Sequence, residues 1–136
     1  MKQLILTLTL LTSISLPGYS QKIERAQKEF VKDFIEAAEI HDQDAVLAMV
    51  DQEYRDWQLD FIDRELSGGV SRFLDELFWT PFNTITKIRV KSIKAFGNDG
   101  DVVIYEFEVT SPEGKVNKTL YLSKKNGVFG FIGASG

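Results

Sequence analysis

The chain has 136 residues, 26% of them charged and 12% aromatic, and its formal net charge is −4. A mildly acidic chain of this kind does not favour nucleic acid or an anionic membrane surface as a partner. It contains no cysteine, which excludes disulfides, thiolate chemistry and a cysteine-linked lipid anchor.

Residues 1–20 have the three regions of a secretory signal peptide. Lys2 gives a positive start, residues 4–16 form an apolar run diluted by Thr and Ser, and the small residue Ser20 precedes the expected cut. The run is too short for a bilayer span, which needs about 20 apolar residues. We therefore predict cleavage near Ser20/Gln21 and an exported product, periplasmic or secreted, that is soluble and free of the membrane.

The expected product, residues 21–136, is one domain. It has 15 basic and 20 acidic residues, a net charge of −5. This length is enough for a single hydrophobic core without covalent staples. Ten Phe and two Trp are available to fill that core.

Two helices are predicted at the start of this domain. Apolar residues recur at three- and four-residue steps from Gln21 to Ile40, which indicates an amphipathic helix with a charged outer face. A polar break follows at His41-Asp42. Asp42 is a suitable N-cap for a second, short helix that runs to about Val50.

Two more helical stretches follow. The third is expected to place Tyr54, Trp57, Phe61 and Ile62 on one face, and it stops at the glycines of residues 66–69. The fourth covers residues 70–79, and Pro81 closes the helical half of the chain.

Beyond Asn83 the apolar period changes from 3.6 to 2, and turn residues appear at 97–100, 111–114 and 126–127. This pattern predicts four antiparallel strands in a meander. The expected register pairs charges on one face of the sheet and apolar residues on the other. The pairs expected on the charged face are Arg89 with Glu108 and Lys91 with Glu106. Those expected on the apolar face are Ile88 with Val109, Val90 with Phe107, Val116 with Val109, Leu120 with Tyr105, and Leu122 with both Val103 and Phe131.

The predicted fold is α+β, with N-terminal helices packed on a curved C-terminal four-stranded antiparallel sheet. This layout resembles the nuclear transport factor two-like (cystatin-like) superfamily. The likeness is carried by the long helix, the polar break and the short Ala- and Val-rich helix, residues 34–50 (FIEAAEIHDQDAVLAMV), and by the C-terminal meander.

The resemblance implies a conical domain with a pocket between the helices and the concave sheet. Members of the superfamily include ketosteroid isomerases, dehydratases, polyketide cyclases and exported binding domains, so the fold does not choose a function. The isomerases use a pocket tyrosine with two carboxylic acids. The inward strand positions predicted for this chain contain no Asp or Glu, and that catalytic set has no obvious match.

Three features have a functional and a structural interpretation, and the structural one is favoured for each. His41 is a candidate base or metal ligand, but it also suits the end of the first helix. Asp56, Asp60 and Asp63 have spacings that suit a hard cation, but they also suit a solvated helix face. The glycine-containing segment 66–69 lacks the lysine and the strand of a phosphate-binding loop. We predict no metal site and no cofactor.

Lys118 does not fit a purely structural interpretation. Strand alternation places it on the apolar face, opposite Phe107, where an ammonium group needs a partner. In the functional interpretation it lines the pocket, with Tyr54, Trp57 and Tyr105 as aromatic walls, and meets an anionic or carbonyl-bearing ligand. In the alternative interpretation, which is favoured for this residue too, a β-bulge or a place near the sheet rim lets its charge reach water. Lys94 is also nominally inward, but it lies close to a turn and is expected to reach water.

The leading hypothesis for function is an exported, non-catalytic domain that binds a small hydrophobic or weakly anionic molecule, or a partner protein. One alternative is an isomerase or dehydratase that uses Tyr54 or Tyr105 with an acid from the third helix. Another is a structural or accessory module of the cell envelope. The sequence leaves open whether the protein is a monomer or a homodimer.

Overall fold

A computed structural model of the chain describes residues 17–96 and 101–136, with side chains from 25 to 95 and from 101 to 136. The predicted signal peptide up to residue 16 and the predicted turn at 97–100 lie outside the described residues. The contacts within the chain divide it into two compact units, residues 1–32 and 33–136.

The first unit is described only as the start of helix α1, Pro17–Glu39. Proline suits the first position of a helix, because its missing N–H would have no partner there. The helix therefore begins before the predicted Gln21, and it ends at Glu39. Arg25, Lys28 and Lys32 are exposed on it. Export and cleavage near Ser20 stay predictions.

The second unit begins with the last turns of α1 and continues with three helices and a short 3-10 helix: α2 Gln43–Ala48, α3 Gln52–Glu65, α4 Gly69–Phe78 and η1 Phe82–Thr84. Aspartates start two of them. The Asp42 carboxylate accepts a hydrogen bond from the backbone N–H of Ala45, and the Asp51 carboxylate accepts one from that of Tyr54. The predicted N-cap at Asp42 is confirmed.

The buried face of α3 differs from the predicted one. Ile62 is buried as expected, but Trp57 is 64% exposed and Phe61 is 40% exposed. Positions 54, 58 and 62 follow each other at four-residue steps and lie on the less exposed side of the helix. Trp57 and Phe61 lie on a neighbouring stripe, so the expectation that they share this buried face was wrong.

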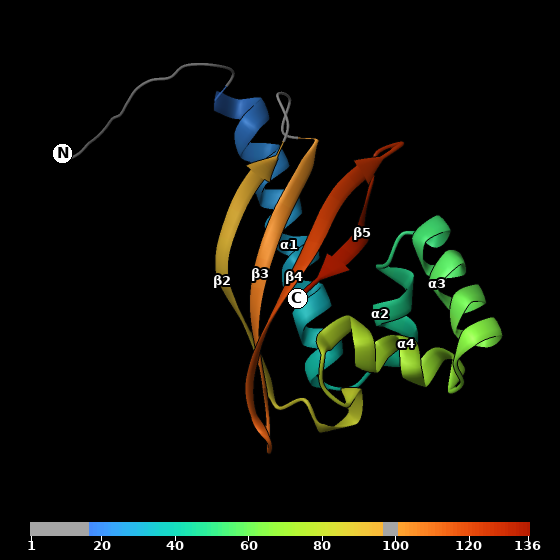
Figure 1. Cartoon of the computed structure of the whole chain (residues 1–136). Helices are drawn as coiled ribbons and strands as arrows, with labels where there is room; N and C mark the ends of the chain where they lie inside the picture. Colours follow the sequence, from blue (N-terminus) through green and yellow to red (C-terminus); the bar gives the residue numbers. More distant parts are fainter. Residues whose placement is uncertain (1–16, 97–100) are drawn as a thin grey trace. The chain divides into compact units, whose positions relative to one another are not determined.

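The C-terminal half of the chain forms one antiparallel sheet with strand order β2-β3-β4-β5 (Figure 1): β2 Lys87–Phe96, β3 Val102–Ser111, β4 Gly114–Lys125 and β5 Val128–Ser135. The last hairpin turns at Asn126 and Gly127, whose φ angles are 52° and 81°. Positive φ at both positions is what a tight two-residue hairpin requires. The predicted meander is confirmed.

The predicted register holds for the central strand pair and for part of each outer pair. Every predicted β3–β4 pair is present, and so are the pairs of Arg89 with Glu108 and of Leu122 with Phe131. A bulge at Lys91 shifts the rest of β2, so that Ser92 and not Lys91 pairs with Glu106. An extra residue reverses the side-chain alternation beyond it.

The bulge also corrects the prediction for Lys94. Lys94 now pairs with Ile104, while its neighbour Ile93 pairs with the buried Tyr105. Lys94 therefore lies on the outer face of the sheet and is exposed. The nominal inward place that strict alternation gave it was wrong, and the expectation that it reaches water is confirmed.

Aromatic side chains join α1, α4 and the inner face of the sheet. The Phe34 ring lies 4.5 Å from the Phe131 ring, 5.6 Å from the Phe78 ring and 6.2 Å from the Phe107 ring, centroid to centroid. All four residues are at most 2% exposed. The segment between α2 and α3 is attached to β5, because the Asp51 N–H donates to the Phe131 carbonyl and the Phe131 N–H donates to that of Met49. The second unit is thus an α+β fold in which α2, α3 and α4 gather beside the β5 edge (Figure 1).

Candidate functional site

Lys118 lies inside the fold, on the inner face of β4. It pairs with Phe107 of β3 and is 5% exposed. The β3–β4 register has no bulge, so strict alternation holds from Gly114 to Ser123 and keeps Lys118 on the same face as Val116 and Leu120. Lys118 therefore has the inward place that strict alternation gives, and the β-bulge of the favoured alternative is absent from this strand pair.

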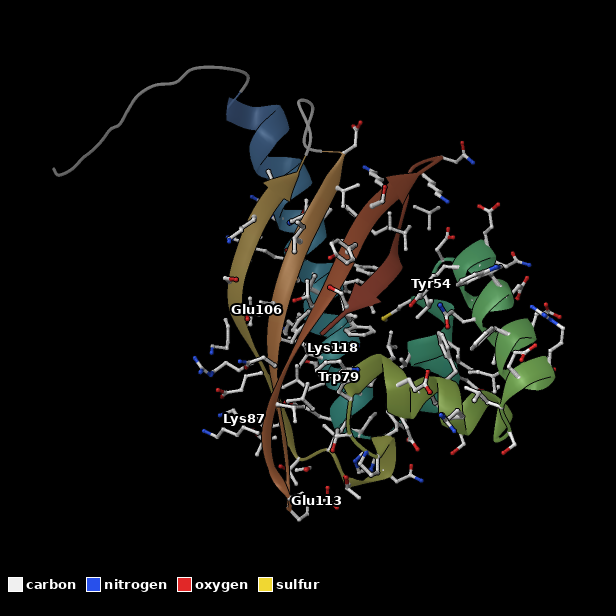
Figure 2. The ribbon with its side chains drawn as sticks, viewed as in Figure 1. Tyr54, Trp79, Lys87, Glu106, Glu113 and Lys118 are labelled. Carbon is white, nitrogen blue, oxygen red and sulfur yellow. The ribbon has the colours of Figure 1, made fainter. Side chains whose placement is uncertain are left out.

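The ammonium group of Lys118 lies over an aromatic ring. Its Nζ is 4.4 Å from the ring centroid of Trp79 (Figure 2), a cation–π contact. Over residues 25–95 and 101–136 no carboxylate oxygen lies within 4 Å of this nitrogen. Burial lowers the pKa of Lys118 below its ordinary 10.5, and the negative charge of Glu76 opposes part of this shift. Lys118 is therefore a buried cation with no ion-pair partner among the described residues.

Trp79 is held in place by the end of α4. It is the C-cap of that helix, with a φ of 56°, and its backbone N–H donates to the Asp75 carbonyl. The Asp75 carboxylate accepts from the N–H of Phe82 at 2.8 Å, which fixes the following turn. Gly136 packs against the indole, since a Cβ at that position would overlap the six-membered ring. The side chain remains 54% exposed and forms an aromatic wall beside Lys118.

A cavity of about 340 Å³ opens beside this pair. Pockets that hold small molecules commonly measure about 300–1,000 Å³, so the volume suits a small ligand. Residues from α3, α4, β4 and β5 line it: Tyr54, Gln58, Phe73, Glu76, Leu77, Trp79, Lys118 and Ala134. We call this cavity the Lys118 cavity. Apolar and aromatic side chains share its walls with four polar groups, which are an ammonium, a carboxylate, a phenol and an amide.

Tyr54 enters the Lys118 cavity from the first turn of α3. Its ring lies 6.3 Å from that of Phe73. Burial, and after it the charge of Glu76, raise the pKa of the Tyr54 hydroxyl above 10.0. The hydroxyl is therefore protonated near neutral pH and can donate a hydrogen bond. Glu76 itself accepts a hydrogen bond from Nε of Arg72 at 2.6 Å.

Two of the four predicted site residues lie elsewhere. Tyr105 is 1% exposed and stacks on Phe107, with ring centroids 5.7 Å apart. It belongs to the core and does not line the Lys118 cavity. Trp57 points away from the cavity on the exposed stripe of α3. Strand alternation placed Tyr105 on the correct face, but it could not tell the core from the cavity.

Most of the residues that line the cavity were not predicted from the sequence. Trp79 follows a helix and precedes Pro81, and nothing in that pattern indicates that it would cover Lys118. Glu76 has Arg72 four residues earlier, which reads as an ordinary surface ion pair. Gln58, at four residues from both Tyr54 and Ile62, carried the one usable signal, because it shares their face. The enzyme hypothesis expected an acid from α3, but the carboxylate in the cavity comes from α4.

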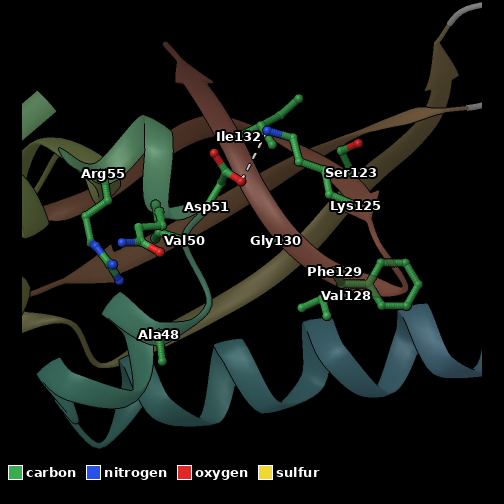
Figure 3. Close-up of a pocket in the computed structure, with 11 residues that line it drawn as sticks. Ala48, Val50, Asp51, Arg55, Ser123, Lys125, Val128, Phe129, Gly130 and Ile132 are labelled. Carbon is green, nitrogen blue, oxygen red and sulfur yellow. Dashed lines mark ion pairs between the residues drawn. The ribbon is translucent and has the colours of Figure 1, made fainter. Parts of the chain in front are cut away.

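A second cavity, of about 240 Å³, lies between the start of α3 and the β4–β5 hairpin (Figure 3). Its charged groups already have partners within the protein. Lys125 lies 3.3 Å from Asp51 and 3.7 Å from Glu53, and Arg55 donates a hydrogen bond to the Leu47 carbonyl. This cavity therefore offers a ligand less unpaired charge than the Lys118 cavity does.

The other candidate residues make structural contacts. His41, with a φ of 61°, donates a hydrogen bond from its Nε2 to the Ile85 carbonyl at 2.8 Å. Asp60 pairs with Arg64 on the exposed face of α3. In the described part of the chain, no three His, Asp or Glu side chains are grouped closely enough to hold a metal ion.

Comparison with known proteins found no matching family model and no curated protein with significant similarity. Among the described residues, no helix has the length and apolar character that a membrane span requires.

Proposed function

We propose that the protein is an exported, non-catalytic domain that binds a small hydrophobic or weakly anionic molecule in the Lys118 cavity. The observation that carries this proposal is the 5% exposed Lys118, whose ammonium lies over Trp79 with no carboxylate within 4 Å in the described chain. A buried charge without a counter-ion is costly, and a ligand carboxylate would offset that cost. The lining by Tyr54, Phe73 and Leu77 suits an apolar body.

We also propose that the domain is a distant member of the nuclear transport factor two-like superfamily. The order of the elements, with helices first and a four-stranded meander last, supports this proposal. So does the position of the cavity, which is lined by helices α3 and α4 and by the inner face of the sheet.

Ligand binding can be measured through Trp79. The variant Trp57→Phe removes the tryptophan that does not line the cavity and leaves Trp79 as the only one in the chain. We expect benzoate and octanoate to change Trp79 fluorescence in a saturable way, and the matched alcohols, benzyl alcohol and octanol, to bind more weakly. A hydrogen bond to a charged group contributes about 1.5–3 kcal/mol, so Lys118→Met should weaken carboxylate binding about 10- to 100-fold.

The control is the same substitution at an exposed site, Lys115→Met, which should leave carboxylate binding unchanged. The binding proposal fails if no probe gives a saturable signal, or if Lys118→Met binds the carboxylates as tightly as the parent.

Export is a separate part of the proposal and has its own test. Mass spectrometry of the protein recovered from the medium or the periplasm should find an N-terminus near Gln21. A product that retains Lys2 in those fractions, or that stays in the cell, would contradict it.

A protein partner, including a second copy of the chain, is the second candidate. It is favoured by one observation, the exposed Trp57 with Phe61 one turn later on α3, because exposed aromatic residues are common anchors of protein interfaces. Analytical ultracentrifugation of the protein and of Trp57→Ala tests the homodimer. A dimer that the substitution dissociates supports it, and a monomer at all concentrations contradicts it.

A further inference from the structure

The amine of Lys118 has the surroundings of a nucleophile as well as those of a counter-ion. It is a primary amine, it is almost fully enclosed, and it lines a cavity that a small molecule can enter. An amine attacks a carbonyl carbon only when it is neutral, and removal from water favours the neutral form. Burial shifts the pKa of Lys118 in that direction. The exposed lysines on the outer face of the sheet lack this enclosure.

Groups that can move protons line the same cavity. The Tyr54 hydroxyl, on α3, is a neutral donor because burial and the charge of Glu76 raise its pKa. The Glu76 carboxylate, on α4, accepts protons and is held by Arg72. These are the charged and titratable groups that line the cavity with Lys118. The Trp79 ring offers a flat surface for an unsaturated ligand.

We propose that Lys118 forms a reversible imine with a small aldehyde or ketone that enters the Lys118 cavity. The Nζ lone pair attacks the carbonyl carbon, and one Nζ proton passes to the carbonyl oxygen to give a carbinolamine. Tyr54 then donates a proton to the hydroxyl, which leaves as water, and the proton that remains on Nζ passes to the Tyr54 oxygen and restores the phenol. One C=N bond replaces one C=O bond, one water is released, and nothing is oxidised or reduced.

This inference rests on the proposed binding function, because the carbonyl compound occupies the same cavity. It narrows the class of ligand to molecules that carry an aldehyde or ketone group next to an apolar or weakly anionic body. It also differs in the charge state of Lys118. Carboxylate binding uses the ammonium, whereas imine formation uses the neutral amine.

The test is reductive trapping with 4-formylbenzoate and sodium cyanoborohydride, which delivers hydride to an imine and makes the bond permanent. Intact mass measures the adduct, which adds the mass of the probe less one oxygen atom, and peptide mapping locates it. We expect Lys118 to be labelled at least about 100-fold faster than the exposed Lys94, because enclosure favours its neutral form and Tyr54 supplies a proton. Tyr54→Phe should slow labelling of Lys118 about 100-fold, the lower end of general acid catalysis.

Lys118→Arg separates the inference from the function on which it rests. Arginine keeps the positive charge but does not form the imine, so this variant should still bind benzoate and should lose the fast adduct. Lys94→Arg is the matched control and should keep the fast adduct.

Each outcome has a distinct meaning. Benzoate binding with labelling spread evenly over exposed lysines overturns the imine and leaves the binding function standing. A fast Lys118 adduct without benzoate binding supports the imine and overturns the anion-binding function. The absence of both overturns both.

Discussion

Strand β4 carries a lysine on each face, and the two lysines have opposite surroundings. Lys115 projects to the outer face, is exposed, and lies 3.8 Å from Glu108. Lys118, three residues later, projects to the inner face and has the Trp79 ring as its contact. A charge on the outer face is solvated, and water can replace its ion-pair partner at little cost. A charge on the inner face without a partner lowers the free energy of unfolding. A residue kept at such a cost is the stronger candidate for a function.

The pairing of charges on the outer face is dense. Arg89 lies 3.2 Å from Glu108, which also faces Lys115 across the β3–β4 pair. Burial would raise the pKa of Glu108, but the hydrogen bond from Arg89 and the charges of Arg89, Lys115 and Lys91 together lower it below 4.5. These charges on the outer face are partners of one another, so their presence there does not require a ligand. The comparison of the two faces leads to four predictions.

The largest effect is expected from the core beneath the inner face. Phe107→Ala removes a 2% exposed ring that contacts the rings of Phe34, Tyr105 and Phe131. Such truncations leave a cavity and lower the free energy of unfolding by about 3–5 kcal/mol. Urea unfolding followed by circular dichroism measures the loss. A loss below that of a typical surface substitution, with Lys115→Ala as the reference, would show that the inner face is not the core.

The next effect has the opposite sign. Lys118→Met replaces the buried ammonium by an unbranched apolar chain of similar length. A buried polar group without a partner costs about 1–3 kcal/mol, so the free energy of unfolding should rise by about that amount while carboxylate binding weakens. Urea unfolding of both proteins without ligand measures the difference. A destabilised Lys118→Met protein would mean that Lys118 is structural.

A smaller effect is the pH dependence of that stability gap. The folded pKa of Lys118 lies below the unfolded value of 10.5, so between the two values the unfolded chain binds more protons and the stability of the parent rises with pH. The gap between Lys118→Met and the parent should therefore narrow as pH approaches 10.5. Tyr54, whose folded pKa lies above 10.0, destabilises both proteins at high pH and cancels in the gap. A gap that widens over this range would contradict the lowered pKa.

The smallest effect is expected on the outer face. The lowered pKa of Glu108 contributes stability above pH 4.5 that is lost as the pH falls through the folded value. Glu108→Gln should flatten the acid limb of the stability curve slightly, and Lys115→Gln should do so even less. Thermal melts from pH 3 to pH 7 test the order. If Glu108→Gln changed the stability at acid pH by as much as Lys118→Met changes it at neutral pH, the charges on the two faces would not differ in their energetic effect.

The sheet shows where prediction from sequence works and where it stops. The β3–β4 pairs followed from alternation and a tight turn, because the side-chain period of a strand is two and one register buries all the apolar residues. The bulge at Lys91 left no signal in the pattern, yet it changed the partner of Glu106 and the face of Lys94. In α3, periodicity predicted that Trp57 and Ile62 share one face, but Trp57 is exposed and Ile62 is buried.

The amino-acid pattern was enough to predict the α+β order of elements, the cap at Asp42, the meander and the face of β4 on which alternation puts Lys118. These features depend on local periodicity, capping and turn chemistry. The surroundings of the Lys118 ammonium, in contrast, depend on tertiary packing. Trp79, Glu76 and Tyr54 lie 39, 42 and 64 positions before it in the chain, and their meeting at one cavity depends on how α3 and α4 pack beside the sheet. Local sequence patterns do not encode contacts across such distances.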